Sequence, residues 1–304
     1  MRNAFIDELI QLATINEKII LVTGDLGYGV IEPFAEEFPD RFFNAGVAEQ
    51  NMMGFSAGLA SEGFHVFAYS IANFTTFRCA EQVRNDVAYH NLPVTIVSVG
   101  GGLSYGNLGY SHHAVQDFAL IRTMPNMLIA SPGDPMETRA CMRYLTKNPQ
   151  PSYLRLGKTG EESFHKKIPK LKPGRWAHVD NKKTSKVILS TGTALSLAKK
   201  ISTHKDMKDY CVFTLPLWGI DYKNIQPEQM SKFSSLLTIE DHLVDGGFGS
   251  WMLESFLNNK ALYSKIDIRG LNSEVCGMVG SQNTLNEAGG LNSEEIINSL
   301  VSRQ

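Results

Sequence analysis

Residues 43–52 read FNAGVAEQNM and place one acidic residue, Glu49, among small and apolar neighbours. Apolar residues recur at helical spacing at Met52, Phe55 and Leu59, so the pattern predicts a helix that begins near Glu49. A carboxylate at the start of a packed helix is largely desolvated, and desolvation raises its pKa. Glu49 is therefore a candidate for sharing a proton with a ligand nitrogen. The alternative is that it only complements the positive end of the helix dipole.

On both sides of this stretch, short apolar runs alternate with segments of helical periodicity. The expected strands lie at 18–23, 41–44, 64–69, 93–99, 127–130 and 152–156. Alternation of this kind predicts an α/β fold in which helices cover both faces of a parallel sheet. Asp134, Pro135 and Glu137 also form the signature of a capped helix start.

The composition shifts between residues 157 and 186, where lysines, prolines and a glycine interrupt any periodicity. We expect a linker there, followed by a second and smaller α/β series. Its expected strands lie at 186–190, 210–215, 236–240 and 266–269. The sequence therefore predicts two domains, residues 1–168 and residues 180–304.

The composition of the 304-residue chain is typical of a globular protein, with 43% hydrophobic and 20% charged residues. The formal net charge of -2 offers no electrostatic footprint for a nucleic acid. No apolar run approaches the roughly 20 residues that a membrane-spanning helix needs. The cysteines are far apart and form no CxxC pair, which favours reduced thiols and a cytoplasmic location: Cys79, Cys141, Cys211 and Cys276.

Three glycine-rich turns follow expected strands, at 100–102, 191–193 and 246–249. None has the spacing of a P-loop or of a dinucleotide-binding motif. The last two precede helices, whose first turns can bind anions. Tight turns without a ligand explain the same residues, and we favour that interpretation.

The adjacent pair His112–His113 lies on an expected loop without a cysteine or a second histidine motif nearby, which disfavours a metal site. An imidazole titrates near neutral pH, so a proton-transfer or hydroxyl-binding role is one interpretation, and a solvated loop histidine is the other. Phe74 and Phe77 also allow two interpretations: helical spacing favours core packing for at least one, and the other could stack on a flat ligand.

Three blocks of this chain resemble the C-terminal portion of transketolase and the related deoxyxylulose-phosphate synthase. They read AGVAEQNMMGFSAGLA at 45–60, GYSHHAVQDFALIRTMPNM at 109–127 and TIEDHLVDGGFGS at 238–250, in the family's order. The resemblance runs from about Ile19 to Gly270. It implies a parallel-sheet pyrimidine-binding domain followed by a smaller α/β C-terminal domain. It also implies an enzyme that uses thiamine diphosphate to transfer two-carbon ketol units between phosphorylated sugars.

The resemblance assigns cofactor roles to four matched residues. Glu49 matches the glutamate that hydrogen-bonds the aminopyrimidine ring and promotes activation of the cofactor, so we expect it to be catalytic. Phe74 matches the ring that stacks on the aminopyrimidine. Arg78 lies in the same cofactor-proximal segment, and Asp25 matches an acid near the cofactor.

Substrate roles follow in the same way. His112 matches the family's substrate-binding histidine and is expected to be catalytic, with His113 beside it as a further substrate contact. Arg155 matches the arginine that grips the acceptor phosphate. We expect no metal ligand in this chain.

The family's GDG motif with a following asparagine holds the diphosphate and its metal, and the chain lacks it. The resemblance therefore implies a separate, GDG-containing N-terminal-type subunit that holds most of the ligands to Mg²⁺ or Ca²⁺. We expect a heterotetramer around a homodimeric core, acting on sugar phosphates.

Two departures bear on the substrate. The family has an acidic residue four positions before the active-site histidine, where this chain has Leu108. The family also has a phosphate-binding histidine near the position of the glycines at 100–102, and this chain has lost it, with Gly100 close to that point. Because lost polar contacts change substrate choice, we expect ketol transfer on a sugar other than, or broader than, the standard pentose phosphates.

Three alternatives remain open. A 2-oxo acid dehydrogenase beta subunit has the same domain pair and size, and a deoxyxylulose-phosphate synthase fragment shares the blocks. A non-catalytic scaffold subunit of the same fold would belong to a different class, and it has no need of Glu49.

Overall fold

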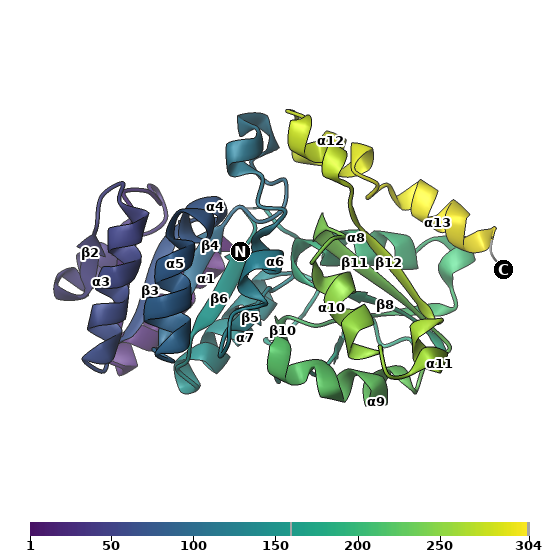
Figure 1. Cartoon of the computed structure of the whole chain (residues 1–304), viewed down its shortest axis with the longest axis horizontal. Coiled ribbons are helices and arrows are strands. Elements are labelled where there is room, and N and C mark those ends of the chain that lie inside the picture. Colours follow the sequence, from purple (N-terminus) through teal and green to yellow (C-terminus); the bar gives the residue numbers. More distant parts are fainter. Residues whose placement is uncertain (159, 303–304) are drawn as a thin grey trace.

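The computed structural model describes residues 1–158 and 160–302, and it folds into two α/β domains that lie side by side (Figure 1). Strands alternate with helices along most of the chain, as the sequence predicts. The strands are β1 Ile19–Thr23, β2 Phe42–Asn44, β3 His65–Ile71, β4 Val94–Val99, β5 Leu128–Ala130, β6 Ser152–Leu156, β7 Ala177–His178, β8 Lys186–Ser190, β9 Tyr210–Thr214, β10 Leu217–Trp218, β11 Ser235–Leu243 and β12 Ile266–Leu271.

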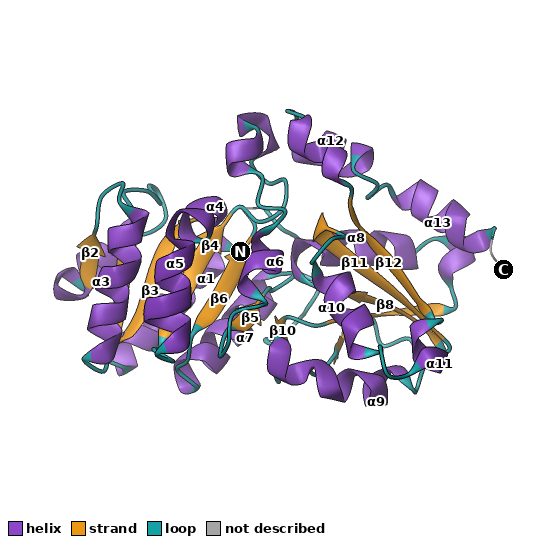
Figure 2. Ribbon diagram, viewed as in Figure 1, coloured by secondary structure: helices purple, strands orange, loops and turns teal. Residues whose placement is uncertain are grey.

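The helices cover the sheets on both faces (Figure 2). The α-helices are α1 Arg2–Ile15, α2 Glu32–Glu37, α3 Glu49–Ser61, α4 Ala72–Thr75, α5 Ala80–Gln82, α6 Asp117–Ile121, α7 Pro135–Lys147, α8 Leu195–Ser202, α9 Gln226–Met230, α10 Phe248–Ser255, α11 Lys260–Tyr263, α12 Gln282–Ala288 and α13 Ser293–Val301. None of the described helices is both long and apolar enough to cross a membrane.

The first sheet has the order β10-β5-β6-β4-β3-β1-β2, and the second has the order β12-β11-β8-β9-β7. Neighbours are parallel except for β10 against β5 and β7 against β9. The predicted α/β fold with largely parallel sheets is therefore confirmed. The order of the first sheet reverses direction around β1 and β3, and their carboxyl ends meet at one edge.

The strand β10 lies in the first sheet although its residues come from the second half of the chain. Leu217 pairs with Ala130, and Trp218 pairs with Ile129. The hydrophobic core also extends across both halves, because a single cluster of buried apolar residues includes Met52 on α3 and Trp251 on α10. The two domains thus share one buried surface.

The segment 72–89 is not one continuous α-helix. It consists of α4, a 3₁₀ turn at Phe77–Cys79, α5 and a π-helical stretch at Val83–Tyr89. π-Helical turns inside helices often occur at functional sites. Phe74 and Arg78 lie in this broken segment, and Arg78 contacts Glu49 at the start of α3.

The predicted start of α7 is confirmed in detail. Pro135 is the first helical residue, and the Asp134 carboxylate accepts a 2.7 Å hydrogen bond from the Glu137 amide. The expected linker holds no helix and no strand between β6 and β7 among its described residues. The first strand of the second sheet begins at Ala177, slightly before the predicted boundary at residue 180.

Candidate functional site

The predicted cofactor residues follow the carboxyl ends of neighbouring parallel strands. Asp25 follows β1, Glu49 lies after β2, and Phe74 follows β3. His112 lies on the loop after β4. Carboxyl ends of parallel strands meet at one edge of a sheet, and ligands bind there where the strand order reverses. The topology therefore brings these residues to one edge.

Glu49 is the first residue of α3, which confirms the predicted helix start. Its side chain is 5% exposed, and one carboxylate oxygen accepts a 3.0 Å hydrogen bond from Nη1 of Arg78. Arg78 itself is 47% exposed. A ligand could therefore approach the buried Glu49 carboxylate from the side on which Arg78 is exposed.

Phe74 and His112 extend this pair into a cluster. The Arg78 guanidinium carbon lies 3.7 Å from the centre of the Phe74 ring, which is a close cation–π contact. The edge of the His112 ring meets Phe74 at a centroid distance of 5.4 Å. We call Glu49, Arg78, Phe74 and His112 the edge cluster.

Partial burial lowers the pKa of His112, and the charges of Arg78 and His113 lower it further. The imidazole is therefore neutral at neutral pH and can accept or donate a proton through its two nitrogens. Its Nδ1 lies 2.9 Å from the hydroxyl oxygen of Ser111. That contact leaves Nε2 as the nitrogen available to a substrate.

Asn44 is a site residue that sequence reasoning missed. Its amide nitrogen donates to Asp25 at 2.9 Å, and its oxygen accepts from the backbone amides of Asp25 and Gly46. The hydrogen bond from Asn44, followed by that from Tyr28, lowers the pKa of Asp25. Asn44 thus ties the loop after β1 to the turn before Glu49. Its position within residues 43–52 was the available signal.

His113 lies inside the protein and does not face a cleft. Its side chain is 1% exposed, its Nε2 lies 3.4 Å from the Gly106 carbonyl oxygen, and its Nδ1 has no partner among the described residues. Asn73 donates to the carbonyl oxygens of Ser111 and His113 and so fixes the loop. The predicted substrate contact by His113 does not fit this burial, and a loop-positioning role does.

The predicted phosphate-binding role of Arg155 does not fit the structure either. Its side chain is 2% exposed, and every guanidinium nitrogen is hydrogen-bonded. Nε donates to Asp117 at 2.7 Å, Nη1 donates to Asp241 at 2.6 Å, and Nη2 donates to the Ala114 carbonyl oxygen at 2.8 Å. Asp241 belongs to the second domain, so Arg155 joins the two domains. We call Arg155, Asp117 and Asp241 the interdomain hub.

The glycines at 100–102 are required by packing. A Cβ at Gly101 would lie 2.7 Å from the Arg155 guanidinium, and one at Gly102 would lie 2.5 Å from the Asp241 carboxylate. A Cβ at Gly100 would lie 2.1 Å from the Tyr105 ring. This result agrees with the interpretation of the loop as a tight turn.

The turn at 246–249 is also occupied by the protein itself. The buried Glu240 carboxylate accepts hydrogen bonds from the backbone amides of Phe248 at 2.5 Å and Gly249 at 2.7 Å, at the start of α10. A side chain of the chain itself therefore already occupies the start of this helix. Burial raises the pKa of Glu240 to about 8, against the opposing effect of these two hydrogen bonds.

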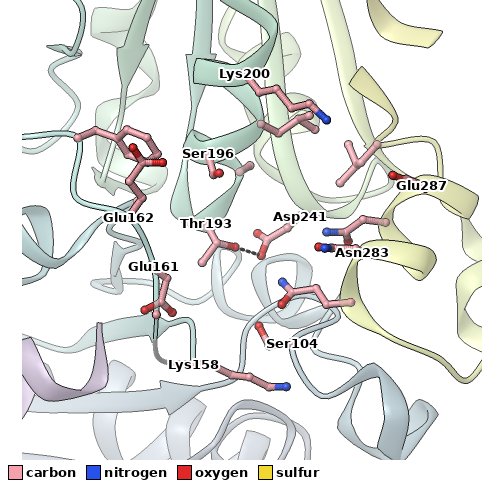
Figure 3. Close-up of a pocket in the computed structure, with 18 residues that line it drawn as sticks. Ser104, Lys158, Glu161, Glu162, Thr193, Ser196, Lys200, Asp241, Asn283 and Glu287 are labelled. Carbon is pink, nitrogen blue, oxygen red and sulfur yellow. Dashed lines mark hydrogen bonds between the residues drawn. The ribbon is translucent and has the colours of Figure 1, made fainter. Parts of the chain in front are cut away.

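A cleft of about 590 Å³ lies between the two domains (Figure 3). Ser104 and Lys158 come from the first domain, and Thr193, Asp241 and Asn283 come from the second. The Thr193 hydroxyl donates to Asp241 at 2.6 Å, so part of the wall is fixed by the hub. The cleft borders the loop that carries His112, but Glu49 and His112 do not line it.

The fold defines a class of α/β proteins that gather candidate ligand-binding residues at the carboxyl edge of a largely parallel sheet. A family model described as "Transketolase, pyrimidine binding domain" matches residues 1–160. The chain is 33% identical to a transketolase C-terminal section of Methanocaldococcus jannaschii, over 99% of this chain and 95% of that protein. It therefore belongs to the transketolase family, which comprises thiamine diphosphate-dependent transferases.

Two further relatives differ in how much of their own length this chain covers. The chain is 33% identical to one subunit of the apulose-4-phosphate transketolase of Phocaeicola vulgatus, over 85% of this chain and 84% of that protein. It is 31% identical to a 1-deoxy-D-xylulose-5-phosphate synthase of Clostridium perfringens, but it spans only 48% of that protein. Two homologues of comparable length are thus described as a transketolase C-terminal section and as one subunit of a transketolase.

A solved structure supports the same correspondence. A split-gene transketolase, an inactive beta4 tetramer, matches with a TM-score of 0.86 and 29% identity, over 99% of this chain and 97% of that one. The transketolase of Leishmania mexicana has the same fold, with a TM-score of 0.79 and 21% identity. The chain covers 44% of that longer protein.

Proposed function

We propose that this chain is the pyrimidine-binding subunit of a two-chain transketolase. The enzyme would transfer a two-carbon ketol unit between sugars or sugar phosphates with thiamine diphosphate. The observation that carries the proposal is the edge cluster, in which a buried carboxylate, an aromatic ring and a neutral histidine meet at the carboxyl edge of the first sheet.

The edge cluster fits the pyrimidine half of the cofactor. The Glu49 carboxylate is buried and can hold a hydrogen bond to a ring nitrogen of the aminopyrimidine. An aromatic ring stacks on a flat heterocycle, and two rings are candidates. Phe74 carries Arg78 on its face, whereas Phe77 is 48% exposed. Thiamine diphosphate, when bound, supplies the electron sink for breaking and forming the carbon–carbon bond.

The substrate would lie between Glu49 and His112. The neutral His112 imidazole can exchange a proton with a substrate hydroxyl, because its pKa lies below its ordinary value. Asp25 and Asn44 would fix the neighbouring loop on the cofactor side. These proposed roles are supported by the location of the residues at the carboxyl edge of the first sheet and by the chemistry of their side chains.

A separate partner subunit would complete the site. It would carry the GDG motif and hold the diphosphate with Mg²⁺ or Ca²⁺, and the assembly would be a heterotetramer around a homodimeric core. The length match to a transketolase C-terminal section and to one subunit of another transketolase supports such a partner. The four free cysteines, three of them buried, support a cytoplasmic location.

The proposed substrate is a sugar other than, or broader than, the standard pentose phosphates. Leu108 is 52% exposed on the loop of His112, where it offers no hydrogen bond to a hydroxyl. Assay of the reconstituted pair with xylulose 5-phosphate and ribose 5-phosphate tests this point. Turnover at ordinary transketolase levels would contradict the altered substrate choice.

Replacement of Glu49 by Gln in the reconstituted pair tests the enzymatic role. We expect turnover to fall by roughly a hundredfold or more, because proton transfer contributes on that order, while the subunits still assemble. Glu62→Gln, in an exposed residue just beyond the same helix, is the matched control and should retain activity. Activity that survives Glu49→Gln would favour the scaffold alternative.

The product distinguishes the enzymatic alternatives. Ketose exchange supports the transketolase. Release of a deoxyketose made from pyruvate would identify a deoxyxylulose-phosphate synthase, and formation of an acyl-lipoamide would identify a 2-oxo acid dehydrogenase.

A further inference from the structure

His112 is the last residue of a short 3₁₀ turn, Tyr110–His112, beyond the carboxyl edge of the first sheet. Its backbone amide donates to the Gly109 carbonyl oxygen at 2.9 Å, and the His113 amide donates to the Tyr110 carbonyl oxygen at 3.1 Å. These two bonds hold the peptide groups on either side of the His112 α-carbon. They lie within the turn itself, so they do not fix its place relative to the sheet.

One side chain from another element supplies that attachment. Nδ2 of Asn73 donates to the Ser111 carbonyl oxygen at 3.1 Å and to the His113 carbonyl oxygen at 3.0 Å. A side-chain amide carries two N–H hydrogens, and both are used here. The two carbonyl groups belong to the residues directly before and after His112. Asn73 therefore holds the turn on both sides of the residue that carries the imidazole.

The helix that carries Asn73 is firmly attached to the first sheet. The hydroxyl oxygens of Thr75 on α4 and Ser98 on β4 lie 2.5 Å apart. The hydroxyl groups of Thr75 and Thr76 also donate to the Ala72 carbonyl oxygen, at 3.1 Å and 2.7 Å. All three hydroxyl side chains are buried. A site residue is held precisely when its support is rigid, and α4 meets that condition.

The same helix carries one of the rings of the edge cluster. Phe74 directly follows Asn73 on α4, and its ring meets that of His112 at a centroid distance of 5.4 Å and an angle of 67°. The guanidinium of Arg78 lies over the same Phe74 ring. Because Asn73 attaches the turn beside Phe74, it determines how His112 lies relative to the rest of the edge cluster.

Stability alone does not explain an asparagine at this position. The Oδ1 atom of Asn73 is buried and has no hydrogen-bond partner among the described residues. An unpaired buried acceptor costs about as much free energy as two neutral hydrogen bonds contribute, so the side chain brings little net stabilisation. Its two hydrogen bonds are better explained by the position that they give to His112.

We propose that Asn73 is a positioning residue that holds the His112 imidazole in line for proton exchange with a substrate hydroxyl. It acts through the backbone of the turn and does not itself touch the substrate. This inference rests on the proposed transferase function for the role of His112. A misplacement of about 1 Å in a reacting group can cost roughly a hundredfold in rate, so such an attachment has a measurable effect.

Kinetics of the reconstituted pair provide the first test. Asn73→Asp keeps the size of the side chain but offers no N–H, and its carboxylate would face two carbonyl oxygens. We expect kcat to fall by roughly ten- to hundredfold while KM changes by less than roughly threefold. Asn73→Gln keeps the amide donors and should recover part of kcat. The control Asn258→Asp adds the same charge at an exposed residue of the second domain and should behave as the wild type does.

Nuclear magnetic resonance of the histidine-labelled chain, without its partner, provides a test that is independent of catalysis. The Phe74 ring lies close enough to displace the ring-proton signals of His112, which His112→Gln identifies by their loss. We expect these signals to move or broaden in Asn73→Ala and to stay in place in Asn258→Ala. Asn73→Ala should unfold within roughly 4 °C of the wild type, as expected for a small change in stability.

Three results would overturn the positioning role. They are wild-type kcat in both Asn73→Asp and Asn73→Ala, unmoved His112 signals in both variants, and a fall of more than roughly 10 °C in the unfolding temperature of Asn73→Ala. The last result would identify Asn73 as a structural residue.

The transferase function fails in a different way. Absence of ketol transfer by the wild-type pair would reject that function, whereas displaced His112 signals in Asn73→Ala would still support the positioning of the turn. Ketol transfer that continues at the wild-type rate in both Asn73 variants would reject the positioning role and keep the transferase function.

Discussion

The interdomain hub and the edge cluster both contain an arginine paired with a carboxylate, but the two arginines differ in how far they are exposed. In the hub, Arg155 is 2% exposed and donates to two carboxylates and two carbonyl oxygens. In the edge cluster, Arg78 is 47% exposed and donates to Glu49. A fully enclosed arginine has no capacity left for a ligand. A half-exposed arginine can release or share its carboxylate when a ligand arrives.

Breaking the hub should have the largest effect. Arg155→Met leaves Asp117 and Asp241 buried without a counter-charge, and we expect it to lower the free energy of unfolding by about 3–5 kcal/mol. Chemical denaturation of the purified chain measures this loss. A decrease below about 1 kcal/mol would show that the hub is not a closed structural unit.

Glu240 is a third buried carboxyl group to compare with those of the hub and the edge cluster. Backbone amides bind it, whereas an arginine binds the other two kinds. Burial raises its pKa to about 8, so the folded protein binds a proton that the unfolded chain has lost above about pH 4.5. Stability from this group is present at low pH and is lost as the pH rises from about 4.5 to 8. Glu240→Gln should remove about 4 kcal/mol of pH dependence between about pH 5 and pH 8, because each pKa unit corresponds to about 1.4 kcal/mol.

Denaturation curves between about pH 5 and pH 8.5, which span the titration of Glu240, provide the measurement. Glu228→Gln, at a residue that is 66% exposed, is the control and should keep the wild-type slope. An unchanged slope in Glu240→Gln would mean that Glu240 is ionised in the folded protein.

His165 offers a smaller test on the linker. Its Nδ1 lies 2.9 Å from the buried carboxylate of Asp134 at the start of α7. Burial lowers the pKa of His165, but Asp134 and Glu137 outweigh that effect and hold it above the ordinary value. The stabilisation is complete below about pH 6.5 and is lost as the pH rises through the folded pKa. His165→Ala should cost about 1–2 kcal/mol at about pH 6 and less at about pH 8.5, as thermal unfolding would show.

The smallest effect on stability is expected at Arg78. Arg78→Met removes a half-exposed partner, so it should change the free energy of unfolding by less than about 1 kcal/mol. Measured beside Arg155→Met under the same conditions, it gives the contrast directly. Equal losses in the two variants would remove the distinction between hub and edge cluster.

Much of the fold could be predicted from local pattern. The strands from β1 to β6 are short apolar runs between helical segments, and Asp134 caps α7 as its spacing indicates. The pairing of β10 with β5 and the break at the π-helical stretch could not be predicted. A two-residue strand has no periodicity, and the partner of Leu217 lies far away in the sequence.

The candidate site was predictable in part for the same reason. Glu49 and His112 lie in two of the sequence blocks that carry the family resemblance, and Phe74 lies in the segment between them. The enclosure of Arg155 depends on Asp117 and Asp241, which are 38 and 86 residues away in the chain. A motif records which residue is present, but not how many partners its side chain already has.

The position of β10 also affects the order in which the protein can fold during synthesis. Residues of the first sheet up to Leu156 leave the ribosome well before Leu217 and Trp218, so β5 remains an uncovered edge until those residues emerge. A nascent chain stopped inside the linker would display that edge together with an incomplete apolar cluster. Emergence of β10, and not completion of the first domain, therefore ends the period in which this edge is exposed to association with other strands.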